Sequence, residues 1–135
     1  MDYLPLFHDL KGRRILVVGG GEIALRKVRL VQEASALITI IAKDYCPDLL
    51  AMDAKDTADG CNGLELITDA YEHRHLLAYP DTVMVIAATN DRDLNRLVSE
   101  HAQAANMLSN VVDDPGFSTV IFPSIVDRSP IQVAI

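Results

Sequence analysis

Three consecutive glycines, Gly19 to Gly21, follow an apolar run and precede a segment with helical spacing in the stretch "ILVVGGGEIALRK". Gly19, Gly21 and Ala24 fit the pattern G-x-G-x-x-A, in which the glycines allow a tight turn and the small third residue lets helix and strand pack closely. Free N–H groups at the start of such a helix hold the phosphates of a dinucleotide, helped by the helix dipole. The turn therefore predicts a dinucleotide site. Its predicted contacts are Gly19, Gly21, Glu22, Ile23 and Ala24.

The stretch "TIIAKD" bears on which dinucleotide binds. An acid that bonds the ribose commonly ends the second strand of such a fold, whereas this chain has Ala42 and Lys43 there, followed by Asp44. Asp44, or backbone groups of Lys43 and Asp44, could reach the ribose, and Lys43 could instead pair with a 2′-phosphate. We favour NAD over NADP and predict Lys43 and Asp44 as cofactor contacts.

A further apolar run ends in "IAATND", where small residues leave room for a nicotinamide ribose. In doubly wound sheets, ligands bind beyond the carboxyl ends of the strands. Thr89 and Asn90 are therefore predicted to contact the cofactor, and Asn90 or Asp91 is also suited to cap the helix that follows.

Two adjacent carboxylates, Asp113 and Asp114, end the apolar run of "LSNVVDDPGF". Asp-Pro-Gly is ordinary turn chemistry, so either acid could simply belong to a turn. However, the carboxyl end of this strand faces the same edge of the sheet as the predicted nicotinamide site. We therefore predict Asp113 as a general base and assign Asp114 to the turn.

The elements that must position these residues are predicted from alternating apolar runs and amphipathic segments of helical length. This alternation is typical of an α/β fold with a Rossmann-like doubly wound parallel sheet. The predicted strands cover residues 14–18, 37–41, 64–67, 83–87 and 107–112. The predicted helices cover residues 22–35, 47 to about 54, 71–77 and 91–105. The polar stretch "AKDTADGCNG" between the second and third strands is predicted to be a surface loop.

The pattern changes after Pro115. The stretch "STVIFPSIVDRSPIQVAI" predicts two extended segments, residues 119–122 and 131–135, with no helix between them for a parallel crossover. We expect a second, β-rich substructure to begin here. Because the chain stops inside an apolar strand, we expect it to be truncated or to pair with another subunit.

The composition restricts the possible functions. The chain has 135 residues, 19 Asp and Glu against 12 Lys and Arg, and a net charge of −7, which argues against nucleic acid as a partner. No segment has transmembrane length and "MDYLPLFHDL" lacks the features of a signal peptide, so we expect a cytoplasmic protein with no membrane partner. The two cysteines and four histidines show no spacing suited to a closed metal site, and no bound metal is predicted.

Taken together, "DYLPLFHDLKGRRILVVGGGEIALRK", "VIAATND", "NVVDDP" and "FPSIVDRSPIQVAI" resemble the N-terminal module of siroheme synthase, the precorrin-2 dehydrogenase/sirohydrochlorin ferrochelatase family. The resemblance implies NAD-dependent oxidation of precorrin-2 to sirohydrochlorin, Fe2+ insertion to siroheme in the same site, and catalysis by Asp113. It also implies a homodimer, with residues 1–113 as a NAD-binding Rossmann domain and residues 114–135 as the beginning of a dimerisation domain. The residues of these motifs predicted to bind substrate are Asn110, Pro123, Ser124 and Arg128.

A tetrapyrrole with many carboxylates needs local cations in an acidic protein. Arg128 is one candidate. The cluster Arg26, Lys27 and Arg29 is another, although we interpret it first as a solvated helix face.

Two other functions remain open at this point. A non-enzymatic NAD-sensing domain of an ion-transport system would share the glycine turn and the Thr89-Asn90-Asp91 segment, but usually carries an acid after the second strand. A generic NAD(P) oxidoreductase without its substrate domain would make Asp113 a turn residue and the last segment a linker, which the apolar strands there argue against.

Overall fold

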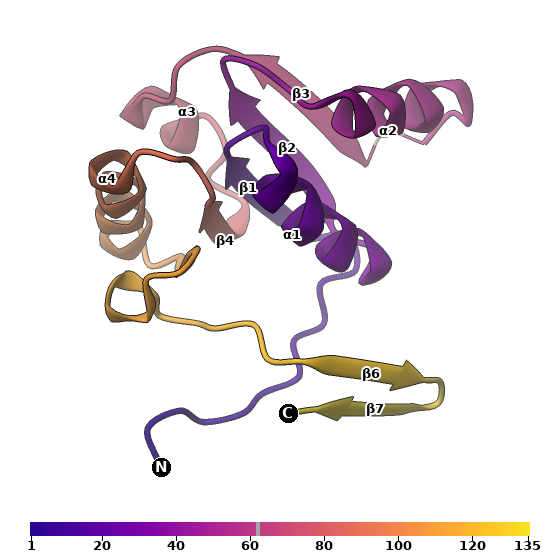
Figure 1. Ribbon diagram of the computed structural model, residues 1–135, viewed down its shortest axis with the longest axis vertical. Coiled ribbons are helices and arrows are strands. Elements are labelled where there is room, and N and C mark those ends of the chain that lie inside the picture. The colour runs from indigo at the N-terminus through magenta and orange to yellow at the C-terminus, as the bar shows by residue number, and fades with distance from the viewer. Residues whose placement is uncertain (62) are drawn as a thin grey trace.

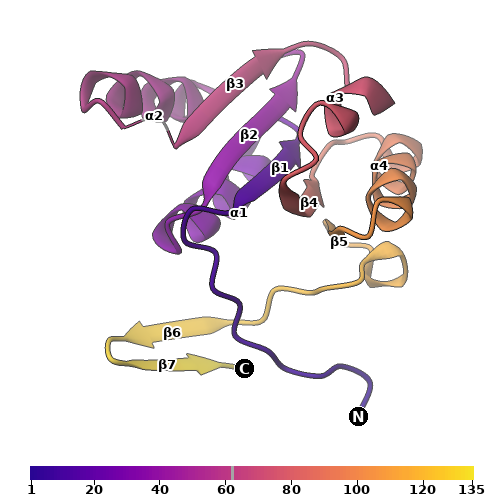
Figure 2. The ribbon, with the colours of Figure 1, turned by 180° about the vertical axis from the view of Figure 1, so that it is seen from behind.

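Five parallel strands, each joined to the next by a helix, form the sheet of the computed structural model, which describes residues 1–61 and 63–135. The strands are β1 (Arg14–Val18), β2 (Leu37–Ala42), β3 (Leu64–Thr68), β4 (Thr82–Ala87) and β5 (Leu108–Val111). Their order in the sheet is β3-β2-β1-β4-β5 (Figures 1 and 2). From β1 the chain adds β2 and β3 on one side of the sheet, and it then crosses back to add β4 and β5 on the other side of β1. The predicted Rossmann-like doubly wound fold is confirmed, and its switch point lies between β1 and β4.

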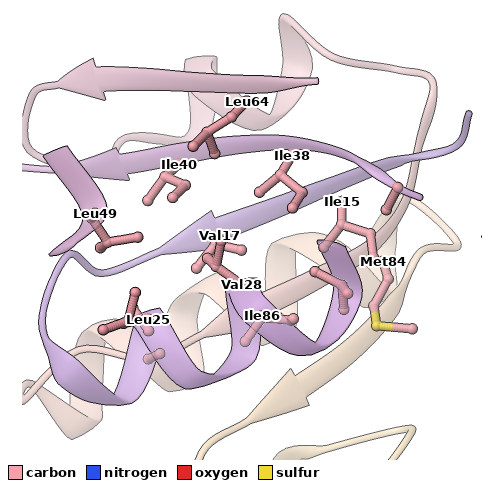
Figure 3. Packing of buried hydrophobic residues seen from close by; sticks show 14 of the residues in the cluster. Ile15, Val17, Leu25, Val28, Ile38, Ile40, Leu49, Leu64, Met84 and Ile86 are labelled. Atoms are coloured by element: carbon pink, nitrogen blue, oxygen red, sulfur yellow. The ribbon is translucent and has the colours of Figure 1, made fainter. Parts of the chain in front are cut away.

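The four helices cover both faces of the sheet. Side chains of α1 (Glu22–Glu33) and α2 (Pro47–Ala58) share one apolar cluster with Ile15 and Val17 of β1, as Figure 3 shows for Leu25, Val28 and Leu49. Side chains of α3 (His73–Leu77) and α4 (Arg92–Ala104) share the cluster on the opposite face with Leu16 and Val18. Because both faces are covered, β1 and β2 are almost fully buried, as their continuous apolar runs predicted.

The helix α2 is longer than predicted. It continues to Ala58, so the prediction of a surface loop from residue 54 is wrong for its first five residues. Four of these five residues are exposed and the fifth is partly buried, whereas Leu49 near the start of the helix is fully buried. The Asp56 carboxylate accepts a hydrogen bond from the backbone N–H of Leu64 (3.2 Å), which ties this helix to β3. Asn62 of the predicted loop lies outside the described residues.

The C-terminal segment was only partly predicted. Residues 119–122 are not a strand, because the backbone N–H groups of Thr119 and Val120 both donate to the same carbonyl, that of Ser109 (2.8 and 3.1 Å), and form no ladder. Instead β6 (Ile125–Arg128) pairs antiparallel with β7 (Ile131–Ala134). The prediction that no parallel crossover occurs here is confirmed.

The β6–β7 hairpin lies apart from the five-stranded sheet (Figures 1 and 2). Every residue of both strands is exposed. Among the described residues, no helix is long and apolar enough to cross a membrane.

Candidate functional site: a dinucleotide cleft at the switch point

The glycine turn fits tightly between the ends of two other strands. Gly19 has φ of +130°, and a Cβ placed on it would lie 2.2 Å from the carbonyl oxygen of Ala88, just after β4. A Cβ on Gly20 would lie 2.1 Å from the carbonyl oxygen of Asp44, just after β2. The backbone N–H of Cys46 also donates to the Gly20 carbonyl (2.8 Å). Gly20 is therefore a structural requirement that the G-x-G-x-x-A pattern did not single out.

Gly21 has a different role, because nothing lies within 4 Å of the position its Cβ would occupy. It is the N-cap of α1, and no side chain caps the helix. The N–H groups of the first helical turn are thus available to an anion, as phosphate binding requires. The open space at Gly21 allows a phosphate to approach the backbone closely.

A cleft of about 760 Å³ opens at this turn and extends along the carboxyl ends of β1, β2, β3 and β4. This volume is typical of a cofactor-sized ligand. All predicted cofactor contacts line it except Ala24, which is fully buried between α1 and the sheet. Ala24 acts through packing, as the last position of the glycine pattern implies, and not through a surface that a ligand could touch.

Residues after β3, which were not among the predicted contacts, form one wall of this cleft. Asp69, Ala70 and Tyr71 line it opposite the glycine turn. The Arg74 guanidinium hydrogen-bonds the Asp69 carboxylate (2.6 Å) and lowers the pKa of that group below its usual value. Burial raises the pKa of Tyr71 to about 12, so its hydroxyl stays neutral. The adjacency of β3 to β2 is the structural reason for their position, and no short motif marks it.

Thr89, after β4, is held in place by a buried side chain of α4. Asn95 is 4% exposed, and its Oδ1 accepts the backbone N–H of Thr89 (3.1 Å). Its Nδ2 donates to the Thr89 carbonyl (3.0 Å). Asp91 caps α4 by accepting the N–H groups of Asp93 and Leu94, which confirms one of the two predicted caps. Hydrogen bonds from Asn95 of α4 therefore fix the loop that borders the cleft.

We expect Asn95→Ala to destabilise the fold by about 1 to 3 kcal/mol, because it leaves backbone polar groups of Thr89 without partners. It should also weaken cofactor binding, because Asn95 holds the backbone of Thr89 at the edge of the cleft. Thermal unfolding and a cofactor titration measure the two effects. Gln103→Ala, in the last part of the same helix, is the control, and equal effects of both variants on cofactor affinity would contradict this role.

Asp113 and Asp114 differ sharply in their surroundings. Asp114 accepts a hydrogen bond from Arg96 Nε (3.2 Å), and the Arg96 guanidinium lies 4.4 Å from the centre of the Phe117 ring. Asp113 is exposed and makes no hydrogen bond or ion pair within the described part of the chain. Its backbone has φ of +58°, a left-handed conformation that Asp tolerates better than most residues. One acid is thus tied into the turn and the other is free.

A small cavity of about 180 Å³ beside Asp113 and Asp114 adjoins the dinucleotide cleft. Asp113 lines this cavity, and Ile23, Thr89 and Asn90 line both it and the larger cleft. The free carboxylate therefore lies beside the part of the cleft that Thr89 and Asn90 border, which is where a nicotinamide ribose was expected.

The four predicted substrate contacts are not brought together with this cavity. Asn110 is 5% exposed; its Nδ2 donates to the Val120 carbonyl (3.0 Å), and its Oδ1 has no hydrogen-bond partner among the described residues. Pro123, Ser124 and Arg128 are exposed on the hairpin and the segment leading to it, and line neither cavity. Within one chain, the hairpin residues lie outside the site.

The three basic residues of α1 differ in their exposure and contacts. Arg26 is exposed, and Arg29 is exposed and 3.6 Å from the Asp48 carboxylate. Lys27 is half-buried, with its ammonium 4.6 Å from the centre of the Phe122 ring. The interpretation as a solvated helix face is therefore wrong for Lys27. In the described residues, no group of three or more His, Cys, Asp or Glu side chains is placed to hold a metal ion.

A parallel sheet with an uncapped helix N-terminus at a glycine turn, and a cleft across its switch point, defines a dinucleotide-binding domain of the Rossmann type. Residues 6–124 match a protein family described as putative NAD(P)-binding, and the chain belongs to this family. The prediction of a nicotinamide dinucleotide as cofactor is confirmed at this level.

Comparison with individual proteins gives a narrower group of relatives than the family does. The chain is 49% identical over all 135 residues to the siroheme synthase of Pseudomonas entomophila (strain L48), and 47% identical to that of Stutzerimonas stutzeri (strain A1501). It covers 27% of each of these proteins, about a quarter of their length. Among solved structures, it is similar to SirC, a precorrin-2 dehydrogenase, with a TM-score of 0.77 and 26% identity over 98% of this chain and 61% of that one. The resemblance to siroheme synthases predicted from four motifs is confirmed.

Proposed function

We propose that this chain is a dehydrogenase module that oxidises precorrin-2 to sirohydrochlorin with NAD+. The observation that carries the proposal is the free carboxylate of Asp113 beside the part of the dinucleotide cleft bordered by Thr89 and Asn90. A sensing domain would need the cleft but not this acid. The similarity to siroheme synthases and to a precorrin-2 dehydrogenase supports the same substrate.

Different residues of the cleft bind different parts of the cofactor. The N–H groups at the start of α1 hold the pyrophosphate, with Gly21 leaving room for it. Lys43 and Asp44 contact the adenosine ribose, and Thr89 and Asn90 the nicotinamide ribose. NAD is favoured because Lys43 is a single exposed cation, which is a weak basis for selecting a 2′-phosphate.

Oxidation of precorrin-2 to sirohydrochlorin removes two electrons as a hydride together with one proton. Bound NAD+ supplies the hydride acceptor. Asp113 accepts the proton from the macrocycle, since its carboxylate borders the cavity and is engaged by no other side chain of residues 1–61 and 63–135. The products are sirohydrochlorin, NADH and a protonated carboxyl group, which returns its proton to solvent.

Insertion of Fe2+ in the same site is the second part of the proposal. Fe2+ is a substrate here, held mainly by the nitrogens of the macrocycle. Asp113 is the group positioned to take pyrrole protons as the metal enters. The support for this step is the similarity to siroheme synthases, of which this chain covers about a quarter.

We also propose that residues 1–113 form the NAD-binding domain and that residues 114–135 begin a homodimerisation domain. An isolated two-stranded hairpin is marginally stable in water, and the β6–β7 hairpin exposes Val126, Ile131 and Val133 on one face. A second copy that covers this face would stabilise it. In the assembled dimer, the substrate would then contact Pro123, Ser124 and Arg128. It would also contact Asn110, which lies in β5 of the Rossmann domain.

The double variant Val126→Lys/Val133→Lys is expected to shift the protein from dimer to monomer, because it places two charges on the apolar face of the hairpin. Sedimentation equilibrium measures the change. Gln132→Lys, on the opposite face, is the matched control and should leave the dimer intact. A dimer unaffected by the double variant would show that the hairpin face is not the interface.

The function is tested by anaerobic conversion of precorrin-2 by the protein in its native full length, with NAD+ and NADP+ compared. We expect sirohydrochlorin to form, and to form faster with NAD+. Cofactor binding without conversion would instead favour the NAD-sensing alternative.

A further inference from the structure

Lys27 of α1 is an unassigned cation close to the proposed catalytic acid. It lies one helical turn after Ile23, and Ile23 lines the cavity of Asp113. Residues four apart on a helix share a face, so Lys27 lies on the same side of α1 as Ile23, one turn beyond the residues that line the cavity. Its half-buried position distinguishes it from Arg26 and Arg29, which face solvent.

The surroundings of the Lys27 ammonium are incomplete for a cation. It lies 4.6 Å from the centre of the Phe122 ring. Within the described residues, no carboxylate lies within ion-pair distance of it. A partly desolvated charge without a paired anion is costly, and an incoming anion would relieve that cost.

The charge of Asp113 affects the pKa of Lys27, although the two side chains form no ion pair among the described residues. Burial lowers the pKa of the Lys27 ammonium below its usual value, and the nearby charge of Asp113 opposes this shift in part. Among the described residues the two groups form no ion pair with each other, so neither charge is neutralised by the other. A ligand that presents an anion to Lys27 would bring its neighbouring atoms toward Asp113.

We propose that Lys27 binds a carboxylate of the tetrapyrrole and thereby orients the macrocycle edge toward Asp113. This inference rests on the proposed function. Phe122 forms the apolar wall beside the ammonium, suited to the methylene groups of a carboxylate arm. Together with Arg92, which lines the cavity of Asp113, Lys27 supplies the local positive charge that a carboxylate-rich substrate requires in a chain of net charge −7.

The test separates substrate binding from catalysis by using uroporphyrin, an unreactive tetrapyrrole that also carries many carboxylates. Its binding to the full-length protein is measured by fluorescence for the wild type, Lys27→Met, Lys27→Arg and Arg29→Met. Met keeps most of the length and apolar contact of the lysine while removing its charge. We expect Lys27→Met to bind uroporphyrin about tenfold or more weakly, with Arg largely restoring affinity. Arg29→Met, which removes an exposed cation of the same helix, should bind like the wild type.

Steady-state kinetics provide the second readout. For Lys27→Met, the KM for precorrin-2 should rise by a similar factor, while the affinity for NAD+ stays unchanged. A merely structural role of Lys27 at the α1 surface would instead alter NAD+ binding or thermal stability.

Unchanged uroporphyrin affinity in Lys27→Met would overturn the inference even if the wild type oxidises precorrin-2. So would a wild type that does not bind uroporphyrin. Conversely, a wild type that binds uroporphyrin through Lys27 but does not oxidise precorrin-2 would uphold the tetrapyrrole site and contradict the proposed dehydrogenase activity.

Discussion

Replacing Asp113 by Asn is expected to lower the rate of precorrin-2 oxidation by about 10²-fold or more, the usual contribution of a general base. The amide keeps the size and the local backbone preference of the acid, so the left-handed turn at φ of +58° should persist. NAD+ affinity should therefore stay unchanged. Anaerobic turnover and a separate NAD+ titration distinguish the two effects.

Asp114→Asn is the matched control for this variant. It weakens the contact with Arg96, a partly exposed ion pair whose contribution to stability is about 0 to 1 kcal/mol. Its activity should stay within a few fold of the wild type. If both substitutions lowered activity equally, Asp113 would have no special role and both acids would belong to the turn.

Gly21→Ala is expected to weaken NAD+ binding by about tenfold or more, because the added methyl group occupies space that the pyrophosphate needs. The fold should be unaffected, since nothing lies within 4 Å of the new Cβ and the backbone there has an ordinary φ of −93°. Isothermal titration with NAD+ and thermal unfolding of the same sample measure both quantities.

The neighbouring glycines provide the contrast. Gly20→Ala brings a Cβ to 2.1 Å from the Asp44 carbonyl oxygen, which should cost about 3 kcal/mol of stability or more. Gly19→Ala adds the strain of φ at +130° to a similar clash. Wild-type NAD+ affinity in Gly21→Ala, or a Gly20→Ala variant as stable as the wild type, would contradict these roles.

The parallel sheet was predictable because its central strands β1, β2 and β4 are buried on both faces and therefore appear as nearly continuous apolar runs. The phosphate-binding turn was predictable because strand, glycines and helix follow each other within one short stretch. The end of α2 was missed because its exposed face is polar, and polarity alone does not distinguish a solvated helix from a loop. The strand β6 was missed because "SIVDR" gains its partner only from the hairpin that follows.

The site was predictable where contacts are local in sequence and not where they are set by packing. Asn95 fixes Thr89 from the next helix, and Asp69 enters the cleft from the neighbouring strand end. Lys27 differs from its two basic neighbours in that Phe122, far along the chain, lies beside its ammonium. Such differences arise from tertiary contacts, which residue types and short spacings do not encode.

The most direct test of the central claim is the stoichiometry of a single anaerobic turnover, with full-length protein in excess over precorrin-2 and NAD+ present. We expect sirohydrochlorin and NADH to appear together in equal amounts. Binding of NAD+ with no NADH formed, or sirohydrochlorin formed without NADH, would contradict the assignment of the cleft to hydride transfer.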